Sequence, residues 1–157
     1  MDFDCDTKSI YATSVAGSGL KEESGRIFQV DPENKKILDT YENFDALGVQ
    51  LYSNREGKRL YLGSARKPEI YSIGLKEDGS FMDDLKFECS LLDAPNGGYF
   101  KGHKIRFLND TMIVKTREFS FSLMAASDDM RTVYRFAYDN KDKKWDFIDL
   151  FDDKTVK

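Results

Sequence analysis

The chain has 157 residues, of which 40% are hydrophobic and 13% aromatic, a composition that predicts a folded globular protein. Its formal net charge is −4, and the 24 basic residues are scattered among 28 acidic ones, so we expect no nucleic-acid partner. No apolar run approaches the roughly 20 residues that span a bilayer, and the acidic N-terminus lacks the apolar stretch of a signal peptide. We expect a soluble single domain over residues 1–157 with no membrane partner; the cellular compartment stays open.

The first module, residues 1–43, contains four short segments with the two-residue alternation of β-strands. Asn, Asp, Gly and Pro gather in the turns between them, as tight hairpins require. The predicted strands are Phe3–Cys5, Ile10–Ser14, Gly25–Asp31 and Lys36–Tyr41.

The same pattern returns twice, in residues 44–92 and 93–157. The second strand of each copy is the clearest element, and the copies are spaced about 50 residues apart. The second module is predicted to have strands Leu47–Tyr52, Leu60–Ser64, Glu69–Leu75 and Phe81–Cys89, and the third Lys104–Leu108, Met112–Thr116, Thr132–Asp139 and Trp145–Phe151. The fold class is therefore all-β.

Four-stranded antiparallel modules of this length are typical of β-propeller blades, which bury themselves only by packing on neighbouring blades. Three blades are half of a six-bladed propeller, and the first and third would each present an apolar face, which monomers rarely expose. We therefore expect completion by pairing, either in a homodimer or with a missing remainder of the propeller. The alternative is a single β-barrel or β-sandwich of ordinary size.

The second module resembles a blade of the gluconolactonase, paraoxonase and strictosidine-synthase-like propellers. The resemblance lies in residues 47–64, through Ser53-Asn54-Arg55-Glu56-Gly57-Lys58 and Leu60-Tyr61, and in the Ile70-Tyr71 strand that Asp78-Gly79 follows. Residues 10–13 and 25–32 are similar to another such blade. In the enzymes, the resemblance implies a six-bladed propeller whose central calcium ion, held by Glu, Asn and Asp side chains, activates a lactone or ester.

Two positions depart from that pattern. Leu47 precedes Gly48 where the family has Asn, and Gly63 stands where the family often has Asp, so two oxygen ligands are missing. Asn96, which precedes Gly97, is the remaining candidate metal ligand, and a plain turn is its alternative reading. No cofactor is assigned, although calcium remains possible.

Loops at one end of a propeller usually carry its binding residues. These are the connections between the second and third strands of each module and those between modules. Arg66, Lys67, Arg117 and Glu118 occupy equivalent loops of adjacent modules, and His103, the only histidine, begins the third. They are candidates for a charged rim that binds a small anionic ligand or a partner protein; solvated loop charges are the alternative. No catalytic residue is identified, because no Ser or Cys nucleophile motif accompanies His103.

Two groups of residues receive structural interpretations. Cys5 and Cys89 are too far apart in sequence for a CxxC pair and are interpreted as two buried thiols or one long-range disulfide. Aromatic residues recur at matching repeat positions and are assigned to blade packing: Tyr11, Phe28, Tyr61, Tyr71, Tyr134, Phe136 and Trp145.

The sequence thus favours a propeller-type binding or assembly module without an intact catalytic metal site. The alternative function is a portion of a calcium-dependent lactonase or esterase-type hydrolase, so enzyme activity stays open. A third hypothesis is an antiparallel barrel that carries a small apolar ligand.

Overall fold

The computed structural model describes residues 1–54, 57–92, 100–122 and 132–152. Twelve strands form in these ranges and no helix, so they hold no helix able to cross a membrane. The strands are β1 (Asp2–Asp4), β2 (Ser9–Ser14), β3 (Arg26–Asp31), β4 (Lys36–Glu42), β5 (Ala46–Asn54), β6 (Gly57–Ser64), β7 (Glu69–Gly74), β8 (Lys86–Ser90), β9 (Phe100–Leu108), β10 (Thr111–Glu118), β11 (Thr132–Asp139) and β12 (Lys144–Asp152). The all-β prediction is confirmed.

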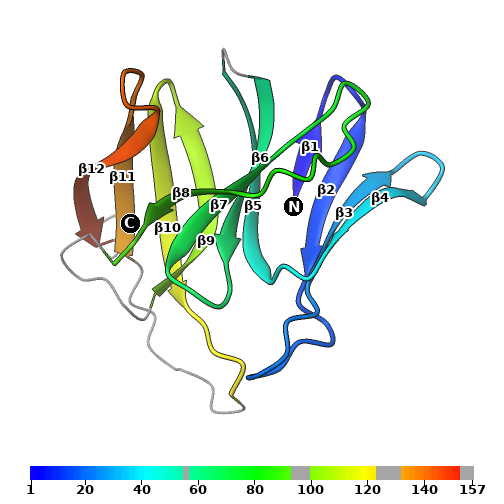
Figure 1. Cartoon of the computed structure of the whole chain (residues 1–157), viewed down its shortest axis with the longest axis horizontal. Coiled ribbons are helices and arrows are strands. Elements are labelled where there is room, and N and C mark those ends of the chain that lie inside the picture. The colour runs from blue at the N-terminus through cyan, green and yellow to red at the C-terminus, as the bar shows by residue number, and fades with distance from the viewer. Residues whose placement is uncertain (55–56, 93–99, 123–131, 153–157) are drawn as a thin grey trace.

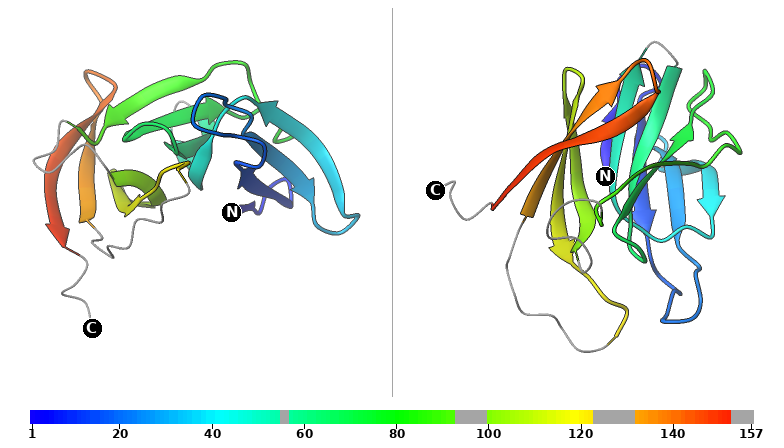
Figure 2. Two further views of the ribbon diagram at one scale, coloured as in Figure 1. Left: turned by 90° about the horizontal axis from the view of Figure 1, so that it is seen from below. Right: turned by 60° about the vertical axis from the view of Figure 1, so that its left-hand side comes forward.

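The strands form three separate four-stranded sheets, each antiparallel and in chain order. The first sheet contains β1 to β4, the second β5 to β8 and the third β9 to β12. Their bounds fall within the three predicted modules. The sheets follow one another along an arc, with the first and third at its two ends (Figures 1 and 2). Neither a single barrel nor a two-sheet sandwich describes this arrangement.

Tight turns connect the hairpins at equivalent places in the first and third sheets. Lys8 and Asn109 stand between the first two strands of their sheets, with φ of 54° and 52°. Lys35 and Lys143 stand between the last two strands, with φ of 54° and 52°. The left-handed conformation at one turn residue lets the chain reverse with the twist of the flanking strands, so the repeat extends to backbone geometry.

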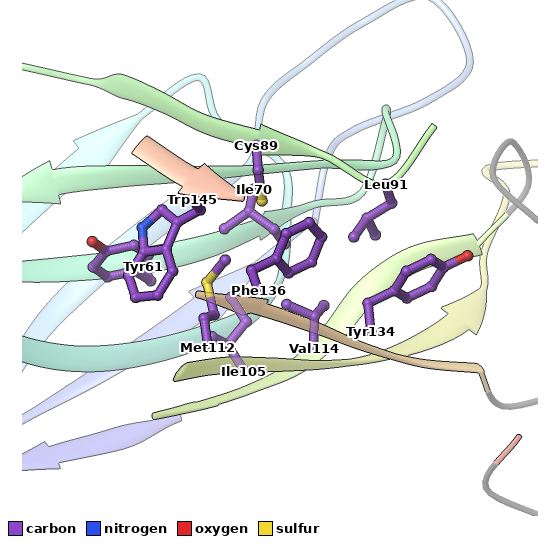
Figure 3. Packing of buried hydrophobic residues seen from close by; sticks show 10 residues of the cluster. All are labelled: Tyr61, Ile70, Cys89, Leu91, Ile105, Met112, Val114, Tyr134, Phe136 and Trp145. Carbon is purple, nitrogen blue, oxygen red and sulfur yellow. The ribbon is translucent and has the colours of Figure 1, made fainter. Parts of the chain in front are cut away.

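Two apolar clusters join the sheets. The cluster between the first and second sheets includes Tyr11, Ile27, Leu60 and Leu62. The cluster between the second and third sheets contains Tyr61, Ile70, Cys89, Leu91, Ile105, Met112, Val114, Tyr134, Phe136 and Trp145 (Figure 3). Five of the seven aromatic residues assigned to packing are buried; Tyr71 is half-buried against the first cluster. Phe28 is half-buried and lies on the side of the first sheet that faces away from the second.

Glycines allow the second and third sheets to approach each other backbone to backbone. A Cβ atom on Gly48 would lie 2.4 Å from the carbonyl oxygen of His103, and one on Gly63 would lie 2.0 Å from that of Gly102. Any side chain at Gly63 would therefore force the sheets apart. The absence of a side chain at Gly63 thus has a packing reason, and neither Leu47 nor Gly63 offers a side-chain oxygen to a calcium ion.

Both cysteines are free thiols. Cys5 is exposed, whereas Cys89 is buried between the second and third sheets. The structure thus has two separate thiols and no disulfide, but the prediction that both are buried is wrong for Cys5, which lies in the turn between β1 and β2.

Candidate functional site

Arg66 fastens the loop after β2 to the second sheet. Its Nε donates to Oδ2 of Asp45 at 2.7 Å, and its Nη2 donates to the carbonyl oxygens of Gly19, at 3.1 Å, and of Glu22. The guanidinium charge of Arg66 is therefore already balanced, and its donors are used within the protein.

Asp45 is the partner that makes this arrangement rigid. Its side chain is fully buried, and its Oδ1 also accepts a hydrogen bond from the Ser18 hydroxyl. Its backbone N–H donates to Oε1 of Glu23 at 2.9 Å. A buried carboxylate that lost these donors would be strongly destabilising. Sequence reasoning missed Asp45 because one Asp in a connecting loop looks like any other polar loop residue.

A pocket opens beside Arg66, where the loops after β2 and β10 reach the same end of the molecule (Figure 1). Its volume is about 430 Å³, within the range of small-molecule sites. Its lining includes Leu20, Arg66, Lys101, Glu118, Phe119 and Phe121. The two phenylalanine rings meet edge to face with centroids 5.0 Å apart, and the Arg66 guanidinium carbon lies 4.9 Å from the centroid of the Phe121 ring.

Lys101 and Glu118 bring opposite charges to this pocket. Both residues are half-buried. Burial lowers the pKa of Lys101, although the charge of Glu69 acts in the opposite direction. Within the part of the chain that the structure describes, neither Lys101 nor Glu118 forms an ion pair or a side-chain hydrogen bond. The pocket therefore offers one cation and one anion to a ligand.

The rim residues proposed from the sequence have different positions. Arg66 and Glu118 line the pocket, whereas Lys67, Arg117 and His103 do not. The Lys67 side chain is 66% exposed, and its Nζ lies 4.0 Å from Oε2 of Glu69. Arg117 is exposed at the end of β10, and His103 is half-buried on β9.

Asn96, the candidate metal ligand, lies outside the described residues. Within residues 1–54, 57–92, 100–122 and 132–152, no three His, Cys, Asp or Glu side chains are grouped so that they could hold a metal ion.

A second candidate surface is the outer face of the first sheet, the side turned away from the second sheet. Phe3, Ile10, Val30 and Ile37 are paired in register across β1, β2, β3 and β4, so they form one apolar row. Phe3 is 49% exposed and Ile37 61% exposed. Ala12 and Phe28 extend the row along β2 and β3. We call these six residues the first outer face.

The outer face of the third sheet is different. Because Met112 and Val114 are buried against the second sheet, Ile113 and Lys115 point away from it. Lys104 stands opposite Lys115, and Arg106 opposite Ile113. Arg135 and Asp149 continue the row of Arg106 and Ile113 across β11 and β12, and their side chains form an ion pair. Val133 and Phe151 continue the row of Lys104 and Lys115, so the outer side of the third sheet mixes charged and apolar residues, whereas the first outer face is an unbroken apolar row.

Comparisons with protein families, with curated proteins and with solved structures find no match to this chain.

Proposed function

We propose that the chain is a propeller-type assembly module that pairs with a second copy through the first outer face. The observation that carries this proposal is the apolar row of Phe3, Ile10, Val30 and Ile37, two of which are about half exposed. Burying apolar surface is favourable by about 25 cal/mol per Å². Soluble monomers seldom leave such a patch uncovered.

The partner surface is the same face of the second copy. The other free face of the chain, on the third sheet, carries Lys104 and Arg106. The six residues of the first outer face are apolar, and Glu42, further along the same side, is already paired with Arg26. Packing those cations against an apolar row would remove their charges from water without compensation. Two apolar faces related by a two-fold axis avoid that cost.

This pairing differs from closure of a six-bladed ring. Ring closure would place the first sheet of one copy on the third sheet of the other, twice. In the proposed dimer only the first outer face is covered, and the charged face stays in water. Because the contact is limited to one side of one four-stranded sheet, we expect a weak, concentration-dependent dimer in the micromolar range.

The resemblance to lactonase blades supports a second reading, a portion of a calcium-dependent hydrolase. No arrangement among the described residues favours it, so it stays an expectation of the resemblance and is not part of this proposal.

The test is the mass in solution, measured by light scattering over a concentration series. The wild-type chain is expected to rise from 18.1 kDa towards twice that mass. Ile37→Lys places two new charges in the symmetric contact and should hold the chain at the monomer mass. Ile148→Lys is the matched control, because Ile148 is 48% exposed on the outermost strand of the third sheet. This control should dimerise like the wild type.

A wild-type chain that stays monomeric at every concentration would refute the proposal. A dimer that persists in Ile37→Lys would refute it equally.

A further inference from the structure

We propose that the pocket lined by Lys101, Glu118, Phe119 and Phe121 binds a small zwitterion with an apolar side chain, chemically an aromatic or aliphatic α-amino acid. Lys101 holds its carboxylate, Glu118 its ammonium group, and the phenylalanine rings its side chain. This site lies at the loop end of the sheets and is independent of the pairing through the first outer face.

The charges of the pocket carry the first step. The Arg66 guanidinium already donates to Asp45 and to two backbone carbonyl oxygens, so it lines the pocket without binding the ligand's charge. Lys101 and Glu118 line the same pocket. No hydrogen bond or ion pair joins them to each other or to any other described residue. Two half-buried charges of opposite sign that have no hydrogen-bonding partner among the described residues are costly to the protein alone, and a ligand that carries both complementary charges satisfies them together.

The apolar walls supply the second step. Phe119 and Phe121 present an edge-to-face pair, and Leu20, which is 70% exposed, lies on the opposite loop. Aromatic rings bind apolar side chains through their area, and their faces also attract an ammonium group.

The environment of Lys101 supports the same assignment. Glu69 is close enough to affect the Lys101 amine electrostatically, and it already accepts a hydrogen bond from the Tyr71 hydroxyl. Burial lowers the pKa of Lys101, so its ammonium form is less favoured than in water. A bound carboxylate would restore that charged form.

The experiment is calorimetric titration of the full chain with three probes. L-phenylalanine carries both charges, 3-phenylpropionate lacks the ammonium group, and 2-phenylethylamine lacks the carboxylate. Since a hydrogen bond to a charged group changes affinity by about tenfold or more, L-phenylalanine should bind about tenfold more tightly than either analogue. No heat of binding for L-phenylalanine at millimolar concentration, or equal affinities for the three probes, would overturn the proposal.

Variants assign the two charges. Lys101→Met should lower the affinity for L-phenylalanine about tenfold and leave that for 2-phenylethylamine unchanged. Glu118→Gln should also lower the affinity for L-phenylalanine about tenfold, but leave the affinity for 3-phenylpropionate unchanged. Lys67→Met is the matched control, because it removes an exposed lysine that does not line the pocket. If Lys67→Met lowered the affinity for L-phenylalanine by the same factor, the effect would come from the net charge of the protein, which would contradict a site at Lys101. The comparison of probes on the wild-type chain holds even if a variant fails to fold.

Discussion

The first and third sheets are copies of one module, yet their two sides differ in character. The side of the third sheet that faces the second is apolar, with Met112, Val114 and Phe136, and its outer side carries the charges of Lys104 and Arg106 beside apolar residues such as Val133 and Phe151. In the first sheet the inner side carries buried polar residues, among them Asp4 and Gln29, and the outer side is apolar. The third sheet therefore has the pattern of a sheet at the edge of a protein, and the first that of a sheet covered on both sides.

Polar contacts hold the inner side of the first sheet in place. Gln29 Nε2 donates to the Asp78 carbonyl oxygen at 2.9 Å, and the Tyr11 hydroxyl donates to that of Gly79 at 2.7 Å. Lys58 Nζ lies 2.9 Å from Oδ1 of Asp4. Because each polar group must meet one partner, these contacts fix how the two sheets align.

The largest effect on stability is expected for Asp4→Ala. The Asp4 carboxylate is buried and accepts hydrogen bonds from Lys58, from the Thr7 hydroxyl and from the Asp6 N–H. Its loss leaves Lys58 with only exposed Asp6, so the free energy of unfolding should fall by about 3 kcal/mol. Urea denaturation measures it. Asp31→Ala, an exposed turn carboxylate of the same sheet, is the control. An equal loss of unfolding free energy in both variants would contradict the claim that the buried contacts of Asp4 stabilise the fold.

Acid should weaken the same contact. Burial acts to raise the pKa of Asp4, but the hydrogen bonds from Lys58 and Thr7 and the Asp6 N–H outweigh it, and the net pKa is lowered. A carboxyl whose folded pKa is below its unfolded value stabilises the fold above the unfolded pKa, about 3.9. That contribution is lost as the pH falls from there through the lower folded value.

Denaturation between pH 6 and pH 2.5 measures this dependence, and Asp4→Asn should make it shallower. An unchanged pH profile in Asp4→Asn would contradict the pairing with Lys58.

A moderate effect is expected when the charged outer side is made apolar. Lys104→Leu combined with Arg106→Leu gives the third sheet an apolar patch like that of the first outer face. Because the new contact between unlike faces does not close on itself, the chain should form species larger than a dimer, with association strengthened by about tenfold. Sedimentation velocity measures this. Lys104→Gln combined with Arg106→Gln should leave the wild-type association; growth beyond the dimer in that variant would point to charge loss as the cause.

The smallest effect is expected at the ion pair on the same outer side. Arg135 and Asp149 form a two-point contact, which lowers the pKa of Asp149, but both side chains are more than 40% exposed. Water screens such pairs. Arg135→Met should therefore leave the melting temperature almost unchanged, as monitored by circular dichroism. If Arg135→Met destabilised the fold as much as Asp4→Ala does, the outer side of the third sheet would have to be buried in the native assembly.

The repeat made most of the fold predictable, because alternation and turn residues mark each strand locally. Several predicted strand boundaries differ from the structure, and two of these differences have reasons that lie beyond local sequence. The predicted strand Phe81–Cys89 narrows to Lys86–Ser90, since Asp84 turns back to accept hydrogen bonds from the Gly74 N–H and from Arg59. Strand β9 starts at Phe100, four residues before the predicted start, because Gly102 packs against Gly63 of the second sheet.

The candidate site was predictable only in part. Equivalent loop positions located Arg66 and Glu118 at one end of the sheets. Lys101 was missed, because its place in the pocket follows from the close packing of β9 on β6. The character of the two outer sides also escaped prediction, since apolar residues alternate on both sheets and alternation alone does not say which side is covered.

The most direct test of the pairing is sedimentation equilibrium of Ile113→Lys beside Ile37→Lys. Ile113 lies on the outer side of the third sheet, so its substitution should leave a dimer of wild-type strength, whereas Ile37→Lys should be a monomer. If Ile113→Lys were monomeric as well, both outer faces would be needed for pairing. The dimer would then be a closed ring, contrary to the self-pairing proposed for the first outer face.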